Sequence, residues 1–188
     1  MRFTLIALAA LSAATPALAH TGAHSVSGFA AGFLHPLGGL DHVLAMIGIG
    51  LFAALLGRGA LFAVPGSFVL MMLVGGIIGM TGWNIPAVEA AIAASVVVVG
   101  AVVALGWSFP MSAAAVLAGF LALFHGYAHG VELPFGASAL PYSAGFMGAS
   151  AALHILGIIM SRIALGRREV TRPVGIAITL AGAMLAFG

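Results

Sequence analysis

Two histidines and an aspartate lie within eight residues at the start of a long apolar stretch: His35, Asp41 and His42. Imidazole nitrogen and carboxylate oxygen are ligands that Zn²⁺, Ni²⁺, Co²⁺ and Fe²⁺ accept. In an unbroken helix the two histidines would share one face, and the aspartate could orient an imidazole from behind. Pro36 and the glycine pair at 38–39 loosen a helix here. The alternative is a polar cluster at a membrane interface that binds no ion.

A second group repeats this chemistry further along the chain. His125 and His129 are one helical turn apart on one face, a spacing that lets two imidazoles hold one ion, and Glu132 continues that face if the helix persists. Haem is disfavoured, because two histidines on one helical face cannot both be its axial ligands. Tyr127, between them, is either an interfacial anchor or a hydrogen-bond donor behind the ligands.

The composition sets the class of protein. Of 188 residues, 63% are hydrophobic and 5% are charged, and the mean hydropathy is +1.24, which is typical of a polytopic membrane protein. Six arginines and no lysine oppose four acids, too few charges to indicate nucleic-acid binding. Cysteine is absent, which excludes disulfides, thiolate metal sites and cysteine nucleophiles.

Residues 1–19 have the pattern of a cleavable signal peptide, with Arg2, an apolar core and a small-residue cleavage site. The rest, 20–188, is predicted to be a single all-α integral-membrane domain. His20 and His24 at its start are either a loose metal site or part of a flexible tail. Six apolar stretches predict a bundle of six membrane-spanning helices, at about 35–56, 65–81, 86–105, 111–130, 144–163 and 171–187. Gly75 and Gly79 have the spacing that lets a neighbouring helix approach closely.

Two signals predict the orientation. Signal-peptide cleavage places the new amino terminus in the periplasm, and five arginines then fall in cytoplasmic loops of a bacterial inner-membrane protein: Arg58, Arg162, Arg167, Arg168 and Arg172. The titratable residues of the spans then lie in the outer half of the membrane, with His154 deepest. We expect His42 and Asp41 to lie within reach of His125 and His129, and Glu89 to join them, because ionisable groups inside a membrane must share water or an ion.

The order of these motifs resembles that of the HupE/UreJ family of hydrogenase and urease accessory membrane proteins. The resemblance rests on residues 35–46 (HPLGGLDHVLAM), 85–89 (IPAVE), 124–134 (FHGYAHGVELP), 142–145 (YSAG) and 153–157 (LHILG). Members of that family are taken to be nickel or cobalt permeases. The resemblance implies metal-handling roles for His35, Asp41, His42, Glu89, His125, His129, Glu132 and His154.

Three functions fit these residues. The leading hypothesis is a secondary permease, not an enzyme, that carries Ni²⁺ or Co²⁺ inward as a transported ion, with no permanently bound cofactor. An intramembrane metal-dependent hydrolase needs the same ligand types, with Glu89 or Glu132 as general base. A metal sensor or assembly factor would need the same group of metal-binding residues in the outer half of the membrane. The expected partners are the divalent ion and the lipid bilayer; a homo-oligomer or a partner in metalloenzyme maturation stays open.

Overall fold

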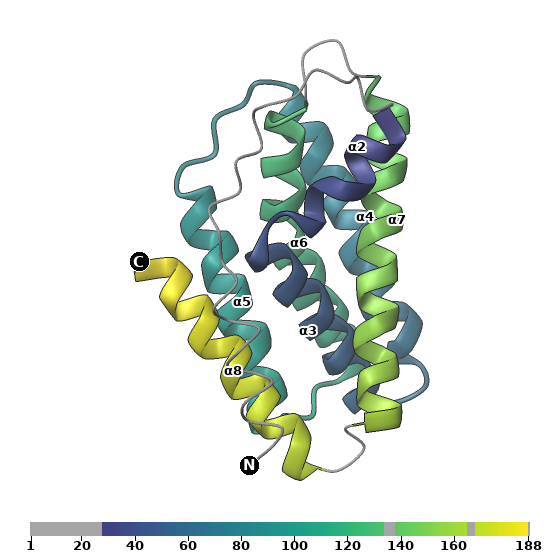
Figure 1. The fold of residues 1–188 in the computed structure, drawn as a ribbon, viewed down its shortest axis with the longest axis vertical. Coiled ribbons are helices and arrows are strands. Elements are labelled where there is room, and N and C mark those ends of the chain that lie inside the picture. The colour runs from purple at the N-terminus through teal and green to yellow at the C-terminus, as the bar shows by residue number, and fades with distance from the viewer. Residues whose placement is uncertain (1–27, 134–137, 165–167, 188) are drawn as a thin grey trace.

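The computed structural model describes residues 28–133, 138–164 and 168–187, and it is all-α over these ranges (Figure 1). The expected signal peptide, 1–19, and the two histidines at 20 and 24 lie outside the described residues. The helices are α2 (Gly28–Leu34), the 3₁₀ turn η1 (His35–Leu37), α3 (Leu40–Leu56), α4 (Ala60–Met80), α5 (Val88–Leu105), α6 (Met111–Val131), α7 (Ala139–Ile159), the π-helical turn η2 (Met160–Ala164) and α8 (Arg168–Phe187).

The first predicted span, 35–56, is not one helix. The chain is helical in α2 and η1, bends by 81° and starts again as α3. Pro36 lies within η1, and Gly39 has an extended backbone with φ −103° and ψ 119°, which no helix accommodates. His35 therefore lies in the turn before the bend and His42 in the first turns of α3. The shared helical face that an unbroken span would give them does not form.

Three other helices begin earlier than the sequence predicts, and one of them is α8, which starts at Arg168 rather than at 171. α4 starts at Ala60, so that Pro65 lies inside the helix rather than at its start. α7 starts at Ala139, five residues before the expected 144, and Pro141 occupies its third position. A proline is tolerated there because the first N–H groups of a helix have no intrahelical acceptor to lose.

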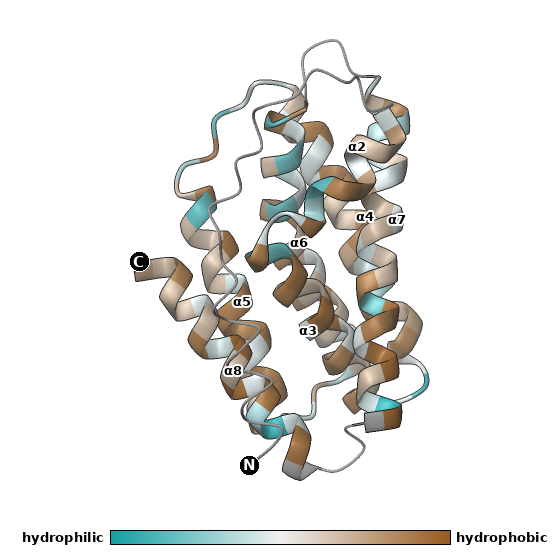
Figure 2. Ribbon diagram, viewed as in Figure 1, coloured by the Kyte–Doolittle hydropathy of each residue, from teal (hydrophilic) through white to brown (hydrophobic). Residues whose placement is uncertain are grey.

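The bundle has the dimensions and surface of a polytopic membrane protein. Among the described residues, five helices are long and apolar enough to cross a bilayer, and the bent pair α2–α3 makes six if it counts as one span. Large apolar side chains are exposed along the outer faces, as lipid contact requires, among them Phe62, Val116, Leu140 and Ile163. Figure 2 shows the hydrophilic stretches gathered at helix ends, on α6 and at the start of α3.

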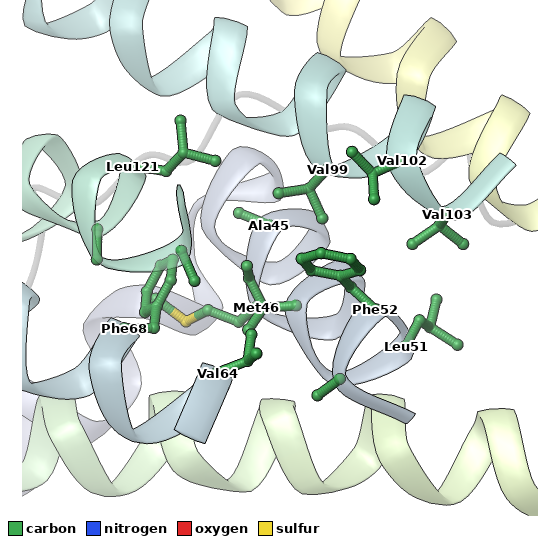
Figure 3. Close-up of a cluster of buried hydrophobic side chains, with 14 of the residues drawn as sticks. Ala45, Met46, Leu51, Phe52, Val64, Phe68, Val99, Val102, Val103 and Leu121 are labelled. Carbon is green, nitrogen blue, oxygen red and sulfur yellow. The ribbon is translucent and has the colours of Figure 1, made fainter. Parts of the chain in front are cut away.

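α3 is the central helix of the bundle. It packs against α7, α5 and α4, and its residues from Gly48 to Ala53 are all buried. A helix that is apolar all round is stable only when neighbours surround it. Figure 3 shows its side chains Met46 and Phe52 meeting Val64 and Phe68 of α4, together with valines of α5. This apolar core surrounds α3 beyond its first turn, from Ala45 to Ala53.

α4 and α6 pack closely through glycines. A Cβ on Gly75 would overlap the carbonyl oxygen of Leu123, and a Cβ on Gly126 would overlap that of Met72. The sequence predicts a close helix neighbour at Gly75 and Gly79, and α6 is that neighbour. Since Gly126 directly follows His125, this packing also fixes the imidazoles of α6 relative to α4.

We predict that Gly126→Ala destabilises the protein by about 1–3 kcal/mol, because the added methyl group has to push α4 and α6 apart. Gly66→Ala is the matched control in α4, since a Cβ there meets no atom within 4 Å. Thermal unfolding of both variants in detergent measures the difference. Equal unfolding temperatures for the two variants would contradict the close packing described here.

Candidate metal site

The bend in the first span brings η1 and the start of α3 against the last turns of α6. α6 carries His125 and His129 there, and Glu132 follows as its C-cap, with its backbone N–H donating to the carbonyl of Ala128 at 3.0 Å. Two segments about ninety residues apart in the sequence therefore supply one set of side chains. The glycine contacts with α4 hold α6 in this position.

Four imidazole rings form a continuous group, which we call the histidine cluster: His35, His42, His125 and His129. The ring centroid of His42 lies 4.6 Å from that of His125 and 4.4 Å from that of His129, and His35 lies 4.7 Å from His129. The sequence predicts that the first and fourth spans meet through these residues, and the ring contacts confirm it. Their role as metal ligands stays a prediction at this point.

Asp41 orients one member of the cluster. Its Oδ1 accepts hydrogen bonds from the backbone N–H of His42 at 2.8 Å and from Nδ1 of the same ring at 2.9 Å. A carboxylate only accepts, so the hydrogen of the neutral ring is on Nδ1 and Nε2 carries a free lone pair. This is the arrangement in which a carboxylate behind a histidine fixes the ring for a metal ion on the other side.

At the exposed end of the cluster, His35 and Glu132 form a hydrogen-bonded pair. Nε2 of His35 donates to Oε2 of Glu132 at 2.9 Å, and the same oxygen lies 3.9 Å from Nδ1 of His129. Ligand atoms of these three residues all lie within 4.8 Å of one another. The hydrogen bond from His35 lowers the pKa of the Glu132 carboxyl, which keeps the carboxylate charged and able to attract a cation.

The two side chains at this end are exposed, and the other three rings are buried. The side chains of His35 and Glu132 are 37% and 52% exposed, whereas those of His42 and His129 are 10% and 6% exposed and His125 is fully buried. Nε2 of His42, Nδ1 of His125 and both ring nitrogens of His129 are buried without a hydrogen-bond partner among the described residues. A buried nitrogen left unpaired costs about 1–3 kcal/mol, so these rings are poised to accept a ligand.

Glu89 is nearby but not bonded to the cluster. It lines the same pocket of about 280 Å³ as His35, Asp41, His42 and His129. Among the described residues, no hydrogen bond or ion pair joins its carboxylate to these side chains. The sequence-based expectation is that Glu89 joins the cluster. Glu89 shares a pocket with the cluster but is not bonded to it.

His154 lies beyond the cluster, on α7. It is 1% exposed, and neither ring nitrogen has a hydrogen-bond partner among the described residues. The ring of Phe68 lies between the two levels, with its centroid 5.8 Å from that of His125 and 5.1 Å from that of His154. His154 is therefore a separate inner position, as the sequence predicts, and Phe68 connects it to the cluster.

Comparison with known proteins identifies the family. Residues 8–185 match the family model described as HupE / UreJ protein. The chain belongs to the HupE/UreJ family. It is similar to Protein HupE of Rhizobium leguminosarum bv. viciae, with 44% identity over 183 residues that cover 96% of this chain and 95% of that protein. The family is associated with nickel and cobalt uptake for hydrogenase and urease. No solved structure matches the chain.

Two residues of this HupE/UreJ chain contact His125 and were not found by sequence reasoning. Phe68 has the sequence pattern of an ordinary core residue, and nothing in the sequence distinguishes it. Ser95 contacts His125, and its signal is a single hydroxyl inside the apolar run of α5. Tyr127 is an anchor: its hydroxyl donates to the carbonyl of Trp83 at 2.6 Å and accepts from the N–H of Ile85 at 3.0 Å.

We predict that Asp41→Asn lowers Ni²⁺ affinity about 10–100-fold, the usual effect of losing a carboxylate behind a metal-binding histidine. An amide at this position can donate to Nδ1 of His42 as well as accept from it, so the ring is no longer held in one tautomer. Glu89→Gln is the matched control and should change the affinity much less, since Glu89 is not bonded to the cluster. Equilibrium dialysis in detergent measures both variants, and equal affinities would contradict the role of Asp41.

Proposed function

We propose that this protein is a secondary permease that carries Ni²⁺, and Co²⁺ as a second ion, from the periplasm to the cytoplasm of a bacterium, for delivery to metalloenzyme maturation. The observation that supports this most strongly is the row of imidazoles that leads from an exposed hydrogen-bonded pair to buried rings. A closed site for one ion needs three or four ligands, whereas a path needs successive ligands at increasing depth.

Ions would be captured at the mouth and passed inward by ligand exchange. The Glu132 carboxylate provides negative charge, and His35 and His129 provide nitrogen beside it. His129 contacts His42, which contacts His125, so an ion can change one ligand at a time without ever losing all of them. Such stepwise exchange avoids the cost of a bare ion in an apolar interior.

Phe68 would act as the gate between the histidine cluster and His154. Its ring contacts both His125 and His154, and it is 1% exposed. Beyond it, Met46, Val64 and Phe52 fill the bundle with apolar side chains (Figure 3). In this proposal the arrangement would be a state closed on the side of His154, and an ion would reach His154 only when the Phe68 ring moves.

This chain would not itself use ATP to drive transport, because its sequence contains no phosphate-binding loop motif. An ion gradient or exchange for protons fits the ligands, since a metal ion binds only neutral imidazole and displaces protons from it. The HupE/UreJ family is a transport and accessory family.

One observation favours a second candidate function. The trio of His35, His129 and Glu132 has the two-histidine, one-glutamate donor set of zinc hydrolases. Two further imidazoles adjoin this trio, however, and a hydrolytic site has no use for them. Tight binding of one Zn²⁺ together with peptide or ester hydrolysis by the purified protein would favour this function over transport.

We predict that a reporter enzyme active only in the periplasm works when fused after Asn84 and fails when fused after Arg58. These residues lie in the loops at the two ends of α4, so they must fall on opposite sides of the membrane. The activity of the reporter enzyme is measured in cells that carry each fusion, and cell fractionation checks that both fusion proteins are in the membrane. The reverse pattern would place the histidine cluster toward the cytoplasm and contradict inward capture.

We predict that His129→Ala and His154→Ala impair the protein in different ways. His129 lies beside Glu132 and also contacts the ring of His42, so its loss removes a proposed ligand from the middle of the cluster. Ni²⁺ binding and uptake should then both fall by about 100-fold or more, which exceeds the usual effect of losing a residue that only supports a ligand. Loss of His154 should leave binding nearly unchanged and slow uptake about tenfold or more.

Equilibrium dialysis in detergent and uptake of labelled Ni²⁺ into vesicles measure the two quantities. Leu153→Ala is the control for His154→Ala, because it truncates the neighbouring buried side chain of α7 and removes no imidazole. Normal uptake by His154→Ala would remove the inner step from the proposal. Normal uptake by His129→Ala would overturn the permease proposal itself.

A further inference from the structure

A buried serine contacts the most deeply buried ring of the histidine cluster. Ser95 lies in the middle of α5 and is 1% exposed, and its Oγ lies 2.7 Å from Nε2 of His125. The same Oγ lies 2.6 Å from the carbonyl oxygen of Ile92, one turn earlier in the helix. α5 otherwise has only apolar side chains between Ala90 and Leu105, so this hydroxyl is isolated among them.

These two contacts determine which nitrogen of His125 carries the hydrogen. The carbonyl of Ile92 can only accept, so the single hydrogen of the Ser95 hydroxyl is used in that bond. The hydroxyl oxygen is then an acceptor toward His125, and Nε2 of the ring must be the donor. The other nitrogen, Nδ1, is left with a free lone pair, and it is buried with no hydrogen-bond partner among the described residues.

His42 is held in a matching way from the other side of the cluster. Asp41 accepts from its Nδ1, which leaves Nε2 with the free lone pair, also buried and unpaired within the described part of the chain. The two rings are in edge contact, with centroids 4.6 Å apart. Two neighbouring rings thus each use one nitrogen for a protein partner and keep the other as an acceptor, and two neutral imidazole nitrogens with free lone pairs are a pair of ligands that one metal ion can share.

We infer that Ser95 is a positioning residue for the transported ion: it holds His125 in the tautomer with hydrogen on Nε2 and so reserves Nδ1 as a metal ligand. This inference rests on the proposed function, because it assigns the free nitrogen to the ion. If Ser95 served only to fill space and to bond the carbonyl of Ile92, its loss would leave both the tautomer of His125 and the affinity for an ion unchanged.

Removing the hydroxyl should free the ring. In Ser95→Ala, Nε2 of His125 has lost its acceptor, so the ring no longer has a reason to keep its hydrogen there, and the tautomer with hydrogen on Nδ1 becomes populated. That tautomer has no lone pair on Nδ1 for an ion. The Ni²⁺ affinity should then fall about 10–100-fold, as it does for other partners that orient a metal-binding histidine.

The tautomer is measured directly by ¹⁵N NMR of metal-free protein with labelled histidine, at a pH where the imidazoles are neutral. Protonated and bare ring nitrogens give well-separated signals, and His125→Ala identifies the signals of this ring by their loss. The wild-type protein should show a protonated Nε2 and a bare Nδ1 for His125. Ser95→Ala should show a mixture of the two tautomers.

Two further variants separate positioning from packing. Ser95→Thr keeps the hydroxyl and should restore both the tautomer and the Ni²⁺ affinity. Ser150→Ala is the matched control: Ser150 is a fully buried serine of α7 that donates to the carbonyl of Phe146 at 2.9 Å and has no hydrogen bond to an imidazole among the described residues. Its removal should change neither quantity, and equilibrium dialysis with Ni²⁺ measures the affinity of all the variants.

The outcomes distinguish this inference from the function on which it rests. If the wild-type protein binds Ni²⁺ and Ser95→Ala keeps both the wild-type tautomer and the wild-type affinity, the positioning role is wrong and the permease proposal is unaffected. A His125 ring with hydrogen on Nδ1 in the wild-type protein also overturns the inference alone. If the tautomers are as described and the wild-type protein binds no divalent ion, the proposed function fails and the assignment of Nδ1 to an ion fails with it.

Discussion

The packing of a bent first span against the last turns of α6 is the interaction on which the rest of the site depends. It places four imidazole rings in contact inside an apolar bundle, where several ring nitrogens have no hydrogen-bond partner among the described residues. Unpaired polar groups in such surroundings are costly, and a fold retains them when a ligand repays the cost. The extended backbone at Gly39 and the glycine contacts between α4 and α6 are what make this packing geometrically achievable.

The electrostatic design of the site follows from that packing. The ring of His42 is fixed by a carboxylate and that of His125 by a hydroxyl, each at the nitrogen remote from the free lone pair. One carboxylate, that of Glu132, lies at the exposed end beside His35, and a second, that of Asp41, lies behind the ring of His42. In the proposed function, the Glu132 carboxylate would attract an ion and the imidazoles further in would hold it, which favours both capture and release to the next ligand.

The sequence was sufficient to predict the all-α membrane bundle, because hydropathy is a strong signal over twenty residues, and to predict that the two histidine groups meet. Pro36 and the glycine pair indicate a weakened helix before α3, but they do not predict the bend itself. The direction of the bend depends on how α2 and α3 pack against α7. Phe68 and Ser95 were missed because an apolar ring and a single hydroxyl become part of a site only through contacts with distant helices. Glu89 shares the pocket without a bond to the histidines, since residues at equal depth need not face one another.

X-ray absorption at the nickel edge, on purified protein loaded with one equivalent of Ni²⁺, tests the central claim most directly. Scattering from imidazole rings is distinct from that of water and carboxylate oxygen, so the spectrum reports whether histidines hold the ion. We predict a spectrum with contributions from more than one imidazole, which are lost when His42 and His129 are both replaced by alanine. A spectrum with oxygen ligands alone, or one that this double substitution leaves unchanged, would contradict the assignment of the histidine cluster as the site of metal capture.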